Sequence, residues 1–119
     1  MKGLTFEEIL EPLLEAPGAI VAAFVDAQGD SIATAGDSLA LEVIGAFQPV
    51  WTSLIAGAAD RGGLGPLEDV EIDLEERRLL VAAVTDGYYI LVLFEKTGVP
   101  SVARARFGAA RERLAVEIG

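Results

Sequence analysis

The sequence predicts an α+β domain in which an antiparallel five-stranded sheet lies between one long helix and two terminal helices. Its apolar segments follow the order α β β α β β β α, and glycine-containing turns join neighbouring strands as hairpins. Residues 19–26, 79–85 and 88–95 are apolar without alternation, which indicates that both faces of the sheet centre are covered. With 119 residues, the chain is expected to form a single domain, residues 1–119, without needing metal or disulfide.

The first helix is predicted to begin after Thr5, because Glu8 follows three positions later and completes a capping box. Pro12 removes a backbone donor from the interior of this helix and crowds the preceding turn, so we expect a kink or a short broken helix. Pro17 and Gly18 end the segment.

A hairpin follows, with one strand over residues 19–26 and a second over residues 31–36. Asp37 or Ser38 can then cap the next helix, because either side chain can accept a hydrogen bond from the first free backbone N–H groups.

The second predicted helix, residues 39–59, has one charged residue, Glu42. Its apolar arc would span roughly 200°, whereas a helix that packs on one sheet needs about 100°, so we expect a second partner. One face of the helix holds Leu39, Val43, Phe47, Val50, Leu54 and Ala58. The flank beside it holds Leu41, Ile44, Trp51, Ile55 and Ala59. The remaining arc is small or polar, with Glu42, Gly45, Pro49, Thr52, Ser53, Ala56 and Asp60.

A membrane-spanning helix is the competing interpretation of residues 39–59, since about 20 apolar residues can cross a bilayer. We favour a helix of a water-exposed domain, because polar residues interrupt the segment and the flanks lack a basic cluster or an aromatic belt. Pro49 is expected to bend this helix rather than to act as a functional hinge.

The next strand alternates apolar and acidic residues over positions 69–75: Val70, Ile72 and Leu74 against Asp69, Glu71, Asp73 and Glu75. This pattern is typical of a half-buried strand with an acidic outer face. A cation site is the alternative, but the acids lack the spacing of a calcium loop, so we favour a face exposed to water. These charges would also discourage indiscriminate pairing if the strand lies at a sheet edge.

The final helix is predicted from Pro100 and Ser101 onward. Its apolar stripe is Val99, Val102, Ala103, Phe107, Ala110, Leu114 and Ile118. Beside it lie two basic rows, Arg104 with Arg111 and Arg106 with Arg113, which are either surface residues or a contact for an acidic partner.

The composition excludes several kinds of chemistry. The chain contains no Cys and no His, which removes the usual zinc site, thiol nucleophile and histidine base. Its net charge of −10 repels phosphate backbones and anionic membrane surfaces, so we expect no nucleic-acid binding. Membrane insertion is not expected either, for the reasons given for residues 39–59. No cofactor, metal site or catalytic residue is predicted, and the acidic N-terminus without a long apolar segment gives an expected cytoplasmic location.

Two further motifs have ordinary structural explanations. The glycine-rich residues 62–65 follow a helix and precede a strand, the reverse of a phosphate-binding arrangement, so a connection is favoured over nucleotide binding. Arg77 and Arg78 could stabilise phosphate charge in a partner's site, as arginine fingers do, but we favour turn residues that neutralise neighbouring acids.

The whole chain resembles the Roadblock/dynein light chain 7 family. The resemblance rests on the first helix ending at Pro17-Gly18, the strand into residues 25–29, the long apolar helix and the closing three-stranded meander. Among members it is most similar to the bacterial MglB-like regulators of small Ras-like GTPases in polarity and gliding motility.

The resemblance implies a profilin-like three-layer fold and a homodimer joined through the long helix and the acidic strand, residues 67–75, which would make a ten-stranded sheet. It also implies that a small Ras-like GTPase docks across the paired long helices, and that hydrolysis can be accelerated without an inserted arginine. We assign GTPase binding to Glu42, Gly45, Pro49, Thr52, Ser53 and Ala56. We assign the dimer interface to Leu41, Ile44, Gln48, Trp51, Ile55, Val70, Ile72 and Leu74.

The expected function is therefore a non-enzymatic dimeric regulator that binds a small GTPase, with action as a GTPase-activating protein as the finer expectation. Two alternatives stay open. A scaffold subunit would recruit another protein without changing GTP turnover. A small-molecule sensor would need spare room in the domain, for which the small residues of the first hairpin are the one hint.

Overall fold

The computed structural model describes residues 4–26, 28, 30–40, 42, 45, 49, 53, 69–85 and 87–118, without the side chain of residue 85. The elements are α1 (Phe6–Leu10), the 3₁₀ helix η1 (Glu11–Glu15), β1 (Ala19–Asp26), β2 (Ser31–Gly36), the 3₁₀ helix η2 (Ser38–Ala40), β3 (Asp69–Asp73), β4 (Arg77–Thr85), β5 (Tyr88–Glu95) and α4 (Ser101–Ile118).

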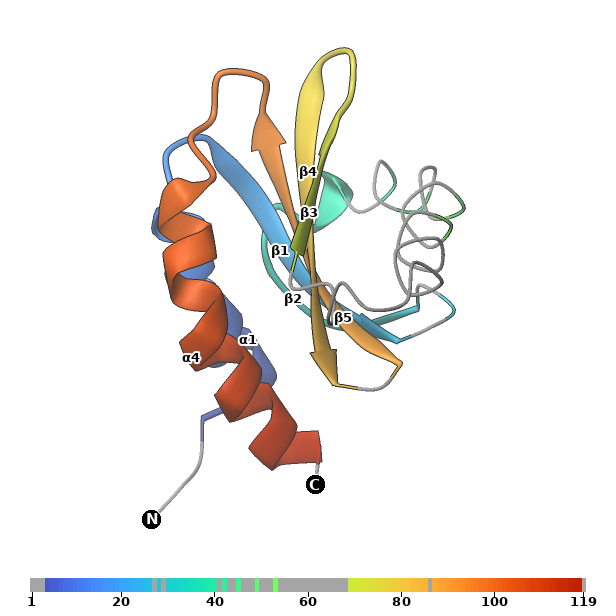
Figure 1. The fold of residues 1–119 in the computed structure, drawn as a ribbon, viewed down its shortest axis with the longest axis vertical. Coiled ribbons are helices and arrows are strands. Elements are labelled where there is room, and N and C mark those ends of the chain that lie inside the picture. The colour runs from blue at the N-terminus through green and yellow to red at the C-terminus, as the bar shows by residue number, and fades with distance from the viewer. Residues whose placement is uncertain are drawn as a thin grey trace, which may run out of the picture.

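The five strands form one antiparallel sheet in the order β2-β1-β5-β4-β3. The predicted α+β fold with a five-stranded antiparallel sheet is therefore confirmed. The apolar strands β1 and β5 lie at its centre, while β2 and the acidic β3 are its outer strands. Helices α1 and α4 lie side by side against one face of the sheet, although they are the first and the last elements of the described chain (Figure 1).

The first helix is capped by Thr5 and Glu8 and broken near Pro12, as predicted. The N–H of Glu8 donates to Thr5 Oγ1 at 3.2 Å and the N–H of Thr5 donates to Glu8 Oε1 at 3.1 Å, which is a complete capping box. Helix α1 ends at Leu10 and continues as η1, with Pro12 in its first turn. The broken helix expected from an interior proline is confirmed.

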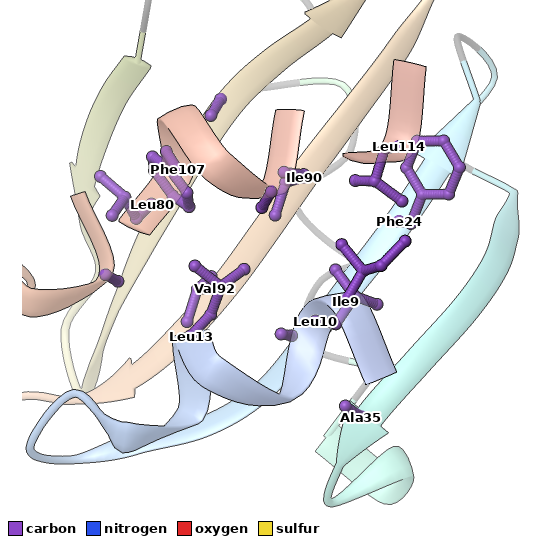
Figure 2. Packing of buried hydrophobic residues seen from close by; sticks show 14 of the residues in the cluster. Ile9, Leu10, Leu13, Phe24, Ala35, Leu80, Ile90, Val92, Phe107 and Leu114 are labelled. Atoms are coloured by element: carbon purple, nitrogen blue, oxygen red, sulfur yellow. The ribbon is translucent and has the colours of Figure 1, made fainter. Parts of the chain in front are cut away.

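The core has two layers, one on each face of the sheet. The larger layer packs α1, η1 and α4 on the sheet, and Figure 2 shows Leu10, Phe107 and Leu114 pointing toward strand residues. The second layer lies on the opposite face and includes Val21, Leu79, Val81, Leu91 and Leu93. Because both faces of the central strands are covered by these layers, their side chains are apolar on both faces, and the sequence does not alternate between apolar and polar residues there.

Val99 is one exception to the predicted stripe of the last helix. It lies before α4, in the connection from β5, and its side chain is 46% exposed. Within α4, the buried stripe consists of Ala103, Phe107, Ala110 and Leu114.

The predicted long helix falls mostly outside the described residues. Its start is described: Asp37 Oδ1 accepts from the N–H of Leu39 at 3.1 Å, so Asp37 rather than Ser38 supplies the capping contact. The prediction that Leu39 lies on an apolar, packed face is wrong, because Leu39 is 83% exposed. Residues 38–40 form a 3₁₀ turn, whose side-chain directions differ from those of an α-helix, and Ala40 packs on the second core layer instead.

Candidate protein-interaction surface

Beyond the 3₁₀ turn at its start, four residues of the predicted long helix are described, and all four are helical and exposed: Glu42, Gly45, Pro49 and Ser53. They belong to the small and polar arc, and their spacing of three to four residues places them along one side of a helix. A Cβ atom added to Gly45 would meet nothing within 4 Å. Apart from Glu42, this polar arc therefore presents little side-chain bulk at the described positions. The other assigned positions of this helix lie outside the described residues: Leu41, Ile44, Gln48, Trp51, Thr52, Ile55 and Ala56.

The outer strand β3 presents two chemically different sides. Ile72 is buried in the second core layer, and Val70 and Leu74 pack against that layer while partly exposed. The apolar residues that we assign to the dimer interface therefore lie on the face of the sheet opposite α4.

The acidic side of β3 faces outward at Asp73, whose side chain is 58% exposed, whereas a helix partly covers Asp69 and Glu71, which the prediction of a solvated face did not include. Arg104 of α4 lies across both: its Nε is 3.2 Å from Asp69 Oδ1 and its Nη2 is 3.4 Å from Glu71 Oε1. The two carboxylate side chains are 26% and 27% exposed. Arg104, one of the basic residues left as either surface residues or a contact for an acidic partner, is a surface residue that contacts the chain's own edge strand.

The end of β3 is held by a second group of charges. Asp73 Oδ1 lies 3.2 Å from Arg78 Nε and 3.6 Å from Lys96 Nζ, and Lys96 also donates to the carbonyl of Leu74 at 2.8 Å. Arg77 Nη1 lies 3.5 Å from Glu95 Oε2. Both arginines of the predicted turn belong to β4 and contact acids of the same chain, in agreement with the neutralising role favoured for them.

A groove of about 250 Å³ lies between the two terminal helical segments, a feature that sequence reasoning did not identify. Its lining is mainly apolar, with Leu4, Ile9, Pro12, Leu13, Ala109 and Ala110 beside Glu8, Arg106 and Arg113. Arg106 is held there by an ion pair with Glu15 and by donation to the carbonyl of Pro12 at 2.7 Å. Pro12, where the first helix breaks, is part of the lining, and no residue of the first hairpin is, although spare room was expected there.

The described part of the chain contains no group of three or more acidic, His or Cys side chains placed to hold a metal ion. Over the same residues, no helix combines the length and apolar character needed to cross a membrane.

Comparisons with known protein families and structures all point to one fold. The sequence model of the Roadblock/LC7 domain family matches residues 5–94. A Roadblock/LC7 domain from Streptomyces avermitilis has a TM-score of 0.75 at 16% identity, over 98% of this chain and 98% of that one. The gliding protein MglB from Thermus thermophilus has a TM-score of 0.70 at 21% identity, over 97% and 91%.

A structure of MglB with a tetrameric arrangement has a TM-score of 0.71 at 21% identity, over 97% of this chain and 90% of that one. A search of curated protein sequences found no significant match. At these identities the structural likeness establishes the fold.

Proposed function

Because the chain belongs to the Roadblock/LC7 family, we propose that it is a homodimeric regulatory protein that binds a small Ras-like GTPase. The observation that carries the proposal is the exposed, small and polar side of the long helix, where Glu42, Gly45, Pro49 and Ser53 are helical and exposed. The exposed side of an amphipathic helix takes no part in packing the domain's own core. Small side chains on that side allow another protein to approach the helix backbone closely. The partner would operate in the cytoplasm, which we propose as the location of this chain.

Self-association is proposed through the flank of the long helix and the outer edge of β3. Strand β3 is the last strand of the described sheet, and its outer edge carries backbone groups that a second strand can pair with. A symmetric pair of such edges would be self-complementary, as a twofold interface requires. The tetrameric arrangement of one MglB structure supports self-association of this fold.

The dimer is tested by Ile55→Asp, which places a charge in the proposed interface at a position outside the described residues. Light scattering should give a dimer for the wild-type chain and a monomer for this variant, because a buried unpaired charge strongly destabilises an interface. A variant that remains dimeric with unchanged affinity would remove Ile55 from the interface.

GTPase binding is tested by a pair of glycine substitutions. Gly45→Arg adds a long side chain to the proposed contact surface, and Gly108→Arg adds the same side chain to α4. A Cβ atom added to either glycine would meet nothing within 4 Å, so both variants should fold. Binding to a small Ras-like GTPase of the same organism, loaded with GDP or a GTP analogue, should fall at least tenfold for Gly45→Arg and change little for Gly108→Arg. Equal losses would place the contact elsewhere.

Stimulation of GTP hydrolysis is the finer part of the proposal. Arg77 and Arg78 already contact Glu95 and Asp73, so we propose that any acceleration works by repositioning the GTPase's own residues. Hydrolysis should be measured with and without this protein, and with Arg77→Ala. Acceleration that survives Arg77→Ala supports this route, whereas binding without acceleration identifies a scaffold.

A further inference from the structure

The outer strand β3 places its three acids on one side of the sheet. Asp69, Glu71 and Asp73 alternate along the strand, and the contacts of Arg104 show that Asp69 and Glu71 face α4. We propose that Arg104 controls self-association of the chain, because it neutralises the acidic edge that two copies must bring together. This inference rests on the proposed homodimer and concerns how that dimer is regulated.

Twofold pairing of two β3 strands forces acids to face acids. In an antiparallel pair, residues directly opposite one another lie on the same side of the sheet. If the two copies form one continuous sheet with α4 on the same side in each, every odd-numbered residue of β3 must oppose an odd-numbered residue of its partner. A pairing centred on Glu71, for example, sets Glu71 against Glu71 of the partner subunit and Asp69 against Asp73 of the partner subunit.

Such a pairing is unfavourable unless cations compensate it, because like charges directly opposite one another destabilise a sheet. The structure supplies a cation contact to each acid from the same chain. Arg104 covers Asp69 and Glu71, at 3.2 and 3.4 Å, and Arg78 and Lys96 cover Asp73, at 3.2 and 3.6 Å. The acidic edge is therefore neutralised before a partner arrives.

Arg104 differs from the other two cations in its origin. Arg78 is paired in register with Asp73 on the adjacent strand, whereas Arg104 comes from α4, 35 residues beyond Asp69. The position of α4 on the sheet thus decides whether the central acids of the edge are compensated. A second copy carries its own Arg104, so its edge is compensated in the same way and the two edges can approach without unpaired acids facing one another.

The proposal is tested by the dimer dissociation constant, measured by sedimentation velocity over a dilution series. Arg104→Ala should weaken the dimer about tenfold at low ionic strength, because both subunits lose the contact. The matched control is Arg113→Ala, which removes one positive charge from the same helix at a position without an ion pair among the described residues. The difference between the two variants should shrink in high salt, which screens the repulsion.

A rescue variant separates repulsion between acids from a general loss of folding. The double variant Asp69→Asn/Glu71→Gln should dimerise at least as tightly as the wild type. When Arg104→Ala is added to this double variant, the dimer dissociation constant should change little. If this double variant instead weakens the dimer tenfold, the acids attract the partner and the proposal is overturned. Because it retains Arg104, it remains informative if Arg104→Ala does not fold.

The result can be distinguished from failure of the homodimer itself. A wild-type chain that sediments as a monomer at all concentrations would refute the homodimer. A wild-type dimer that becomes monomeric with Ile55→Asp, but responds equally to Arg104→Ala and Arg113→Ala, would leave the homodimer in place and refute the role of Arg104.

Discussion

Gly18 occupies a crossing point where two parts of the chain touch through their backbones, and Gly18→Ala should therefore be strongly destabilising. Gly18 has a φ of 81°, in the left-handed region that non-glycine residues rarely adopt. Its carbonyl accepts from the N–H of Glu95 at 2.9 Å, and the carbonyl of Pro17 accepts from the N–H of Val99 at 2.9 Å. These bonds join the end of the N-terminal helical segment to the connection that leads into α4.

The cost of Gly18→Ala has two sources. The left-handed backbone costs an alanine about 1–2 kcal/mol. The new Cβ would lie 2.6 Å from Gly98 Cα, so backbone must move, and overpacking of this kind costs about 1–3 kcal/mol. A loss of roughly 3 kcal/mol in the free energy of unfolding is expected, which lowers the melting temperature by about 12 °C for a domain of this size.

Thermal unfolding followed by circular dichroism, with urea titration for the free energy, tests this value against Gly108→Ala. Gly108 lies within α4, is exposed and has no atom within 4 Å of an added Cβ. Alanine there should stabilise the chain by about 0.5–1 kcal/mol, since it lowers the entropy cost of forming the helix. If both substitutions change stability by similar amounts, the close approach of Gly18 and Gly98 does not exist in solution.

Three smaller predictions concern local contacts. Thr5→Ala should cost about 1 kcal/mol in urea titration through loss of the cap, and no change would mean that the capping box does not persist in solution. Leu114→Ala should cost about 2–5 kcal/mol because Leu114 is fully buried, whereas Val116→Ala, at a side chain that is 77% exposed, should cost under about 0.5 kcal/mol. Asp26→Ala removes two hydrogen bonds of 3.0 Å to the N–H groups of Gln28 and Asp30; amide hydrogen exchange should accelerate there, and unchanged exchange would contradict this turn.

The elements predicted best are those whose determinants are local. The structure confirms four such elements: the cap at Thr5, the break at Pro12 and the strands β1 and β5. Each of them depends on residues that are close together in the sequence. Leu39 shows where a periodic pattern fails, because assigning a face requires knowing at which residue the α-helical period begins. The chain makes a 3₁₀ turn first, and this turns Leu39 outward.

The partial cover of Asp69 and Glu71 by α4 could not be predicted, because it depends on Arg104, a residue distant in sequence. Alternation of apolar and acidic residues fixes which residues share a side of the strand, but it does not tell which side a helix covers. Acids are usually assigned to the solvent, and that rule holds unless a cation is placed to compensate them. Arg104 is so placed by the packing of Ala103 and Phe107 into the core, which fixes the rotation of α4 and carries the guanidinium to Asp69 and Glu71. The cover over Asp69 and Glu71 is therefore set by the core of the last helix. If Arg104 acts as proposed, substitutions that rotate α4 should alter self-association without changing any residue of β3.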